Sequence, residues 1–323
     1  MDLQPDSEHA KVPAVVRSEV SARMHSISEN KKAGSLPQIL TIQSGVMWGE
    51  VGNDAAMPIY QHDGLHAIRL DTVRLAAHPG YGTTYAAVTP AAELAALFAD
   101  FSALDASRSL RICQTGYLGQ ASQCDVLARE IAALKQKNPQ LLYCLDPVLG
   151  DGGRMYVSTD IATAMMSHLL PLADILTPNQ FELSLITQTD IPDTDGAITA
   201  AARLCERSGN PELNILVTGV SEPAWPDEIC DILVSRSQQI IVRHQRNSAG
   251  VSGAGDALTA LYLSHLVRGA SSEQAMRAAS AKASQLLSSS PSQRDIGLRQ
   301  WLASSDEDRD GRPASDLSGS AAP

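Results

Sequence analysis

The stretch Ser252–Gly253–Ala254–Gly255–Asp256 leads directly into the apolar, helix-forming run Ala257–Leu263. The two glycines let the backbone turn tightly and bring several N–H groups close to a ligand. The helix that follows points unpaired N–H donors and the positive end of its dipole at the same spot. Such a turn binds an anion, most often a phosphate group.

Asp256 does not fit a plain phosphate site, because its carboxylate repels the ligand. Taking a proton from an attacking hydroxyl group is the function that suits a carboxylate in this position. The alternative is a helix N-cap, where Asp is a favoured residue. The flanking glycines and the polar loops described below favour catalysis over capping.

Composition and charge narrow the class of protein. The 323 residues carry a net charge of −11, which argues against nucleic acid or an anionic membrane as a partner. No apolar run approaches the roughly 20 residues that cross a membrane, and the polar N-terminus lacks the apolar stretch of a secretory signal. The five cysteines contain no CxxC pair, which predicts reduced thiols in a cytoplasmic protein.

The chain divides into one domain with two tails. Residues 1–36 and 304–323 lack hydrophobic periodicity and are predicted to be a disordered extension and a disordered tail. Between them, residues 37–303 alternate short apolar strands with helical segments, which predicts an α/β fold with a parallel sheet covered on both faces. The alternating runs Ile229–Ser235 and Gln239–Arg243 predict an antiparallel hairpin at one edge.

Polar residues follow the predicted strands, at the edge of the sheet where ligands bind in such folds. These strand-end residues are Ser44, Thr72, Thr115–Gly116–Tyr117, Asp146, Thr177–Pro178–Asn179 and Thr218. Any one of them is an ordinary loop residue. Six such loops, together with the 253–256 turn, predict a binding site at this edge.

Two of these loops carry carboxylates with more than one interpretation. Asp146 and Asp151, in the segment DPVLGD, suit a hydrated Mg²⁺ ion near a nucleoside triphosphate, but Asp and Gly are also ordinary turn residues. Glu182 lies three residues after Asn179, the spacing of a helix capping box. The functional alternative places Glu182 near the metal and Asn179 near the nucleotide phosphates.

The motifs that are absent exclude two classes of nucleotide-binding enzyme. No GxxxxGK[ST] segment is present, so this is not a P-loop enzyme, and no GxGxxG opens the first strand–helix unit as in nicotinamide-dependent dehydrogenases. His78 lies in a glycine-punctuated loop that could cover a ligand. An exposed loop histidine is the simpler expectation there.

In their order and spacing, these motifs resemble those of pyridoxal kinases in the ribokinase-like superfamily, over about residues 38–287. The matching segments include Gln43–Ser44, Gly52–Asn53, Thr115–Gly119, Asp146–Asp151, Met155–Val157, Thr177–Glu182, Val217–Thr218 and Gly253–Asp256. The resemblance implies a three-layer α/β/α sandwich with an antiparallel edge hairpin, usually as a homodimer. It also implies transfer of the γ-phosphoryl group of ATP to the 5′-hydroxymethyl group of pyridoxal, and often of pyridoxine and pyridoxamine.

The resemblance also assigns roles to residues. It makes Asp256 the catalytic base and the N–H groups of Gly253, Ala254 and Gly255 the anion hole. The positions expected to line the ATP site are Asp146, Asp151, Thr177, Asn179 and Thr218. Those expected near Mg²⁺ are Glu182 and Tyr156. Those expected around the pyridine ring are Ser44, Thr72 and Tyr117. The need for a monovalent cation stays open.

Two departures from the family pattern bear on the substrate. Ala254 stands where relatives carry Thr or Val, which keeps the N–H group but removes any hydroxyl. The loop over residues 73–81 differs from the family forms, so the preferred B6 vitamer stays open. The alternatives are a kinase for hydroxymethylpyrimidine and a non-catalytic B6-binding protein, against which the retained Asp256 argues.

Overall fold

The computed structural model describes residues 36–82, 85–246, 251–288 and 294–303. Apart from Leu36, the predicted extension (residues 1–36) and the predicted tail (residues 304–323) lie outside these ranges, so the domain boundaries stay a prediction. Among the described residues, no helix has the length and apolar character needed to span a membrane.

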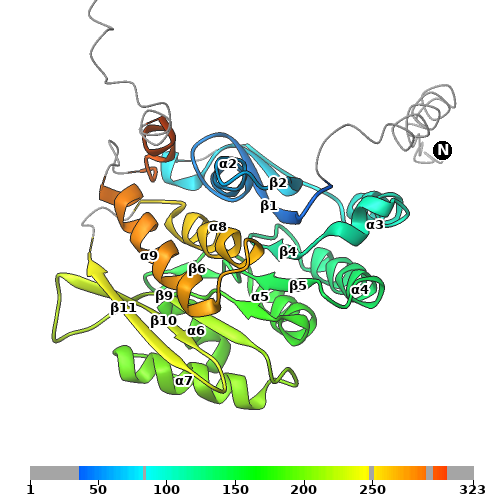
Figure 1. The fold of residues 1–323 in the computed structure, drawn as a ribbon. Helices are drawn as coiled ribbons and strands as arrows, with labels where there is room; N and C mark the ends of the chain where they lie inside the picture. Colours follow the sequence, from blue (N-terminus) through cyan, green and yellow to red (C-terminus); the bar gives the residue numbers. More distant parts are fainter. Residues whose placement is uncertain (1–35, 83–84, 247–250, 289–293, 304–323) are drawn as a thin grey trace, which may run out of the picture. The chain divides into compact units, whose positions relative to one another are not determined.

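Nine strands of the described chain form one sheet (Figure 1). In spatial order they are β11 (Gln239–Gln245), β10 (Glu228–Val234), β9 (Asn214–Ser221), β8 (Ile175–Leu176), β5 (Leu142–Leu145), β4 (Ile112–Thr115), β1 (Ile39–Trp48), β2 (Ala67–Ala77) and β3 (Ala86–Val88). The run from β9 to β2 is parallel, while β10, β11 and β3 join through antiparallel pairs. The predicted mostly parallel sheet with an antiparallel edge hairpin is therefore confirmed.

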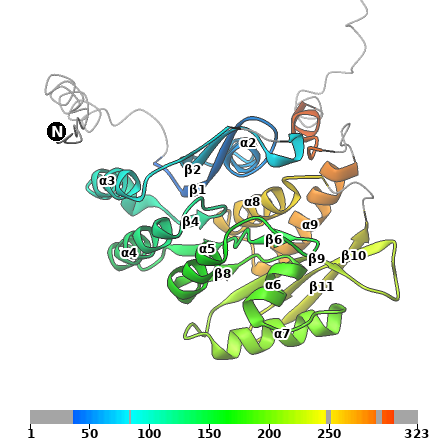
Figure 2. The ribbon, with the colours of Figure 1, turned by 180° about the vertical axis from the view of Figure 1, so that it is seen from behind.

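Helices cover both faces of the sheet, which Figures 1 and 2 show from opposite sides. One apolar core packs against α2 (Asn53–His62), α8 (Ala254–Val267) and α9 (Ser272–Ser288). The other packs against α3 (Ala91–Ser102), α4 (Ala121–Lys137), α5 (Thr159–Ala164), α6 (Gln180–Thr187) and α7 (Thr194–Arg207). The result is the three-layer α/β/α sandwich.

Sequence pattern explains how individual helices pack. In α4 the buried residues Cys124, Leu127, Ile131 and Leu134 recur at helical spacing and form one stripe toward the sheet. In α8 every residue from Ala257 to Ser264 is buried, because this helix lies between the sheet and its neighbours α2 and α9. The helix that begins with the glycine turn is thus anchored along most of its length.

The structure corrects the expected ends of the first two strands. Ser44 and Thr72 were expected where β1 and β2 end, but both strands continue, to Trp48 and Ala77. A register shift near Ser44 lets pairing resume, with Gly45 opposite Arg74. A second, two-stranded sheet, β6 (Gly150–Asp151) with β7 (Arg154–Met155), was not predicted because its strands are too short to show a pattern.

Candidate active site

The 253–256 turn forms the start of α8. Gly253 has a φ of 90°, a left-handed conformation that favours glycine. A Cβ atom there would lie 1.9 Å from the backbone oxygen of Glu50, so no other residue fits. The first N–H groups of a helix lack partners within it, and a Cβ built on Gly255 meets no described atom within 4 Å. The turn therefore leaves room for a ligand beside Gly255.

Asp256 lies in the first turn of α8, beside the chain that follows β1. The backbone N–H of Gly52 donates to its carboxylate. Removal from water raises the pKa of Asp256, and the Gly52 hydrogen bond limits the rise. Gly52 has a φ of 56°, and a Cβ there would come within 2.4 Å of the Ser44 carbonyl oxygen. Gly52 therefore contacts both Ser44 and Asp256, which brings these three residues close together.

Asp146, at the carboxyl end of β5, joins this group from the other side. The hydroxyl of Thr259, one turn after Asp256 on α8, lies 3.3 Å from Asp146 Oδ2 and 3.1 Å from Thr177 Oγ1. Burial raises the pKa of Asp146 well above its usual value, and the nearby charges of Asp256 and Glu182 raise it further. Asp146 and Thr177 were predicted for this site, whereas Thr259 was missed because it belongs to an apolar helical run.

Glu182 forms the capping box that its spacing predicts, and it does more. Asn179 Oδ1 accepts the Glu182 N–H at 2.9 Å, and Glu182 Oε2 accepts the Asn179 N–H at 2.9 Å. Oε1 also accepts the N–H groups of Leu149 at 2.8 Å and Gly150 at 3.3 Å. Burial nevertheless raises the pKa of Glu182 to about 7, although these amides favour its ionised form. Glu182 therefore fixes the 146–151 loop against α6.

Thr218, within β9, continues this side of the site. It forms a parallel bridge with Asn179, and its N–H donates to the Pro178 carbonyl at 2.9 Å. Asp146, Thr177, Asn179 and Thr218 are therefore linked directly or through one neighbour. All four were predicted at strand ends.

A buried carboxylate supports the residue after Thr218. Asp231 on β10 accepts the Gly219 N–H at 3.1 Å, the Ser280 hydroxyl at 2.7 Å and a His244 ring contact at 3.0 Å. Burial lowers the pKa of His244, but the hydrogen bond and charge of Asp231 outweigh that effect and leave it raised. No sequence motif pointed to this cluster, since its members lie far apart along the chain.

Ser44, Thr72 and Tyr117 also come together. Ser44 and Thr72 lie on neighbouring strands at the register shift, and both are buried. The Thr72 hydroxyl donates to the Tyr117 carbonyl at 2.6 Å. This hydroxyl therefore holds the loop after β4 in place.

Asp151 and Tyr156 lie farther out than the other predicted residues. Both are exposed. Asp151 adjoins the turn of the β6–β7 hairpin, where its Oδ1 accepts the Gly152 N–H at 2.7 Å, and Tyr156 follows the second strand of that hairpin. Partial burial and the charges of Asp151 and Glu182 raise the pKa of Tyr156, which keeps its hydroxyl protonated. These two residues form the outer margin of the site.

The charges of this site suit a cation. Burial raises the pKa of Asp146, Glu182 and Asp256, and none of the three forms an ion pair with a described Lys, Arg or His. The described residues contain no group of three His, Cys, Asp or Glu side chains arranged as a metal site. Mg²⁺ needs no such group, because it keeps several waters and binds one or two carboxylates together with substrate phosphates. Asp146 and Glu182 fit that role.

The expectation that His78 is an exposed loop residue is wrong, because its side chain is only 2% exposed. Its Nε2 lies 3.2 Å from Asp295 Oδ1, and its Nδ1 accepts the Gly80 N–H at 3.1 Å. The Tyr81 hydroxyl donates to Asp295 Oδ2. Asp295 is 217 residues away in the chain, so local sequence gave no signal for it.

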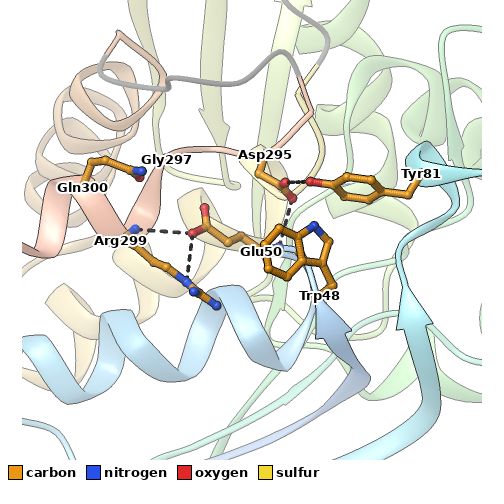
Figure 3. A pocket seen from close by; sticks show the side chains of 8 residues that line it. Trp48, Glu50, Tyr81, Asp295, Gly297, Arg299 and Gln300 are labelled. Carbon is orange, nitrogen blue, oxygen red and sulfur yellow. Dashed lines mark hydrogen bonds and ion pairs between the residues drawn. The ribbon is translucent and has the colours of Figure 1, made fainter.

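A cavity of about 250 Å³ borders this cluster (Figure 3). Its lining combines aromatic and charged side chains from both ends of the domain: Trp48, Gly49, Glu50, Tyr81, Asp295, Gly297, Arg299 and Gln300. Figure 3 shows Asp295 between Tyr81 and the Glu50 segment. The cavity adjoins the 253–256 turn, because the Glu50 backbone contacts Gly253.

Known proteins resemble this chain in sequence and in fold. The family model described as phosphomethylpyrimidine kinase matches residues 83–296. A pyridoxine/pyridoxal/pyridoxamine kinase from Bordetella avium is 35% identical over 243 residues, which cover 75% of this chain and 81% of the relative. The chain belongs to the phosphomethylpyrimidine kinase family, in its pyridoxal kinase branch. A pyridoxal kinase from Rubrobacter xylanophilus is 33% identical over 74% of this chain and 82% of its own.

Solved structures of the pyridoxal kinase branch share the fold. The crystal structure of pyridoxal kinase from Entamoeba histolytica has a TM-score of 0.78 and 25% identity, and the match covers 84% of this chain and 95% of that one. The pyridoxal kinase from Leishmania donovani in complex with ADP and pyridoxine has a TM-score of 0.76, at 23% identity over 86% and 96% of the two chains. The fold predicted from the ribokinase-like resemblance is therefore confirmed.

Proposed function

We propose that this protein transfers the γ-phosphoryl group of ATP to the 5′-hydroxymethyl group of pyridoxal, and of the related B6 vitamers, with Asp256 as the base. The observation that carries the proposal is the placement of Asp256. Its carboxylate lies in the first turn of α8, beside the open space at Gly255 and between the Ser44 and Asp146 groups. An acceptor on one side and a nucleotide on the other would meet there.

Asp256 takes the proton of the acceptor hydroxyl as the oxygen attacks the γ-phosphorus. A positioned base of this kind contributes about 10²–10⁴-fold to the rate. The raised pKa of Asp256 makes the carboxylate a stronger base than a fully hydrated one. The Gly52 N–H donates to the carboxylate and lowers its pKa, which opposes the effect of burial.

The amides of Gly253, Ala254 and Gly255 form the anion hole. They are oriented before the reaction, so they stabilise charge that builds on the transferring group without reorganisation. Losing one donor of this kind costs about 3–4 kcal/mol in comparable sites. Ala254 suffices here, because the backbone N–H makes the contact.

The nucleotide lies along the Asp146, Thr177, Asn179 and Thr218 side, with Asp151 at its margin. Glu182 and Asp146 would hold Mg²⁺, which when bound would neutralise charge on the phosphates. Tyr156, whose hydroxyl stays protonated, can add a hydrogen bond near the metal. These assignments rest on the closeness of the side chains and on the uncompensated carboxylate charge.

The acceptor ring lies near Ser44, Thr72 and Tyr117. The Thr72 hydroxyl is used by the Tyr117 carbonyl, so Thr72 shapes the wall and Ser44 is the better candidate for a polar contact. A homodimer in the cytoplasm completes the proposal. Five buried free thiols support a reducing compartment, and light scattering on the purified protein would test the dimer.

A panel of acceptors tests the function. The protein is incubated with ATP, Mg²⁺ and each of pyridoxal, pyridoxine, pyridoxamine, hydroxymethylpyrimidine and ribose, and products are identified by mass spectrometry. We expect phosphorylated pyridoxal. Preferential phosphorylation of hydroxymethylpyrimidine would favour the second candidate, which the description of the family model suggests. Pyridoxal binding with no phosphorylated product would make the chain a binding protein.

A further inference from the structure

The carboxylate of Asp295 joins three segments of the chain. It accepts the backbone N–H of Glu50 at 3.1 Å, and it contacts His78 Nε2 and the Tyr81 hydroxyl. Glu50 lies just beyond the end of β1, and His78 directly follows the end of β2. One side chain near the C-terminal end of the domain thus holds the continuations of two neighbouring strands.

The segment 294–299, which carries Asp295, is attached at two further points. The Glu50 carboxylate accepts the N–H groups of Leu298 at 2.9 Å and Arg299 at 3.4 Å. The N–H of Ser252, next to the glycine turn, donates to the Arg294 carbonyl at 2.9 Å. Glu50 therefore bonds to this segment through its amide and its side chain. Its carbonyl oxygen lies directly against Gly253.

Neighbours from several segments hold the His78 ring in place. Because Nδ1 accepts the Gly80 N–H, Nε2 carries the proton and donates to Asp295. The ring meets Tyr81 edge-on with 4.7 Å between centroids. A Cβ on Gly49 would lie 2.7 Å from the ring, so the turn after β1 packs directly against it. This packing couples the 78–81 loop to the 49–52 turn.

We propose that Asp295 is a positioning residue for the acceptor. By holding Glu50 and the 78–81 loop, it fixes the 49–52 turn, from which Gly52 reaches Asp256. The affected side is that of the acceptor, because Ser44 and Thr72 lie on the two strands that Asp295 joins. The residues assigned to ATP lie instead after β5, in β6, after β8, at the N-cap of α6 and within β9. The three segments that Asp295 joins carry none of them. This inference rests on the proposed function.

Steady-state kinetics of Asp295→Asn test the proposal, with Asp100→Asn on the exposed face of α3 as the matched control. Loss of a charged acceptor shared by three donors should raise the KM for the acceptor about tenfold, while the KM for ATP stays within about twofold. Tyr81→Phe keeps the ring and removes one hydrogen bond, so it should act in the same direction by about threefold. In the double variant, the Tyr81 effect should largely disappear.

A second measurement is independent of which compound is the substrate. Hydrogen exchange of the folded Asp295→Asn protein should quicken at the amides of Glu50 and Gly80, and stay unchanged around Thr218. If the wild type phosphorylates no acceptor, the proposed function fails. The hydrogen-exchange result then decides by itself whether Asp295 positions the 49–52 turn and the 78–81 loop. Equal rises in both KM values, additive effects of the two variants, or unchanged exchange at Glu50 would overturn it.

Discussion

The two sides of the site are built in different ways. On the nucleotide side, Asn179 and Glu182 are three residues apart, and the side chain of each accepts the backbone N–H of the other. The Glu182 carboxylate also holds the 146–151 loop. On the acceptor side, the turn after β1 and the loop after β2 depend on Asp295, which lies at the far end of the domain. The nucleotide side thus includes a local capping box, whereas the turn and loop of the acceptor side are held by a residue more than 200 positions away in the sequence.

This difference predicts how each side responds to change. A residue in a local capping box affects its own helix and loop. A residue that joins distant segments affects the relative placement of two strands and everything that they carry. Asp256 lies where the two sides meet, so its loss should affect turnover without favouring either substrate.

The largest effect is expected for Asp256→Asn. The variant keeps the shape of the side chain but cannot accept the proton, so kcat should fall by about 10²–10⁴-fold. Calorimetry should show ATP binding within about twofold of the wild type. Turnover near that of the wild type would remove Asp256 as the base and leave it as a helix cap.

Gly253→Ala should disrupt the contact between Glu50 and the glycine turn, where the acceptor side meets α8. The added Cβ would lie 1.9 Å from the Glu50 oxygen in a left-handed conformation, so the turn must move. Displacing an anion-hole amide should lower kcat by about 10²-fold. The control is Gly209→Ala, where a Cβ meets no described atom within 4 Å. If both variants are equally active, the turn does not bind the transferring group.

Glu182→Gln should weaken the nucleotide side alone. An amide nitrogen would face backbone N–H groups that now donate to a carboxylate, so urea denaturation should report a loss of about 1–3 kcal/mol. The Mg²⁺ concentration needed for half-maximal rate should also rise, and the KM for the acceptor should not. Exposed Glu206→Gln on α7 is the control. An unchanged metal titration would leave Glu182 a structural capping residue.

The smallest expected effect is a pH dependence of the free energy of unfolding, which arises from His244 at the edge of the nucleotide side. The folded protein raises the pKa of His244 through Asp231, so His244 contributes stability below its unfolded pKa of about 6.5. That contribution is lost as the pH rises through the higher folded value. The free energy of unfolding of the wild type, relative to His244→Gln, should therefore fall between about pH 6 and 8. If the difference between the two proteins does not change across that range, the assignment to His244 is wrong.

What the sequence could predict follows the same division. The capping box of Asn179 and Glu182, the glycine turn before α8 and the strand-end polar residues all depend on neighbours in the sequence. The continuation of β1 beyond Ser44 depends on pairing with β2, which no local pattern records. His78 and Asp295 contact each other although they are 217 residues apart in the sequence, so no local pattern predicts the burial of His78 or the role of Asp295. Thr259 was hidden because a buried hydroxyl on an apolar helix resembles a core residue.

The most direct test of Asp256 is a crystal structure with pyridoxal and a non-hydrolysable ATP analogue bound together. We expect the 5′-oxygen to lie about 2.6–3.2 Å from the Asp256 carboxylate, with the γ-phosphate facing the amides of the 253–255 turn. An acceptor hydroxyl out of reach of Asp256, or a γ-phosphate bound away from α8, would contradict it.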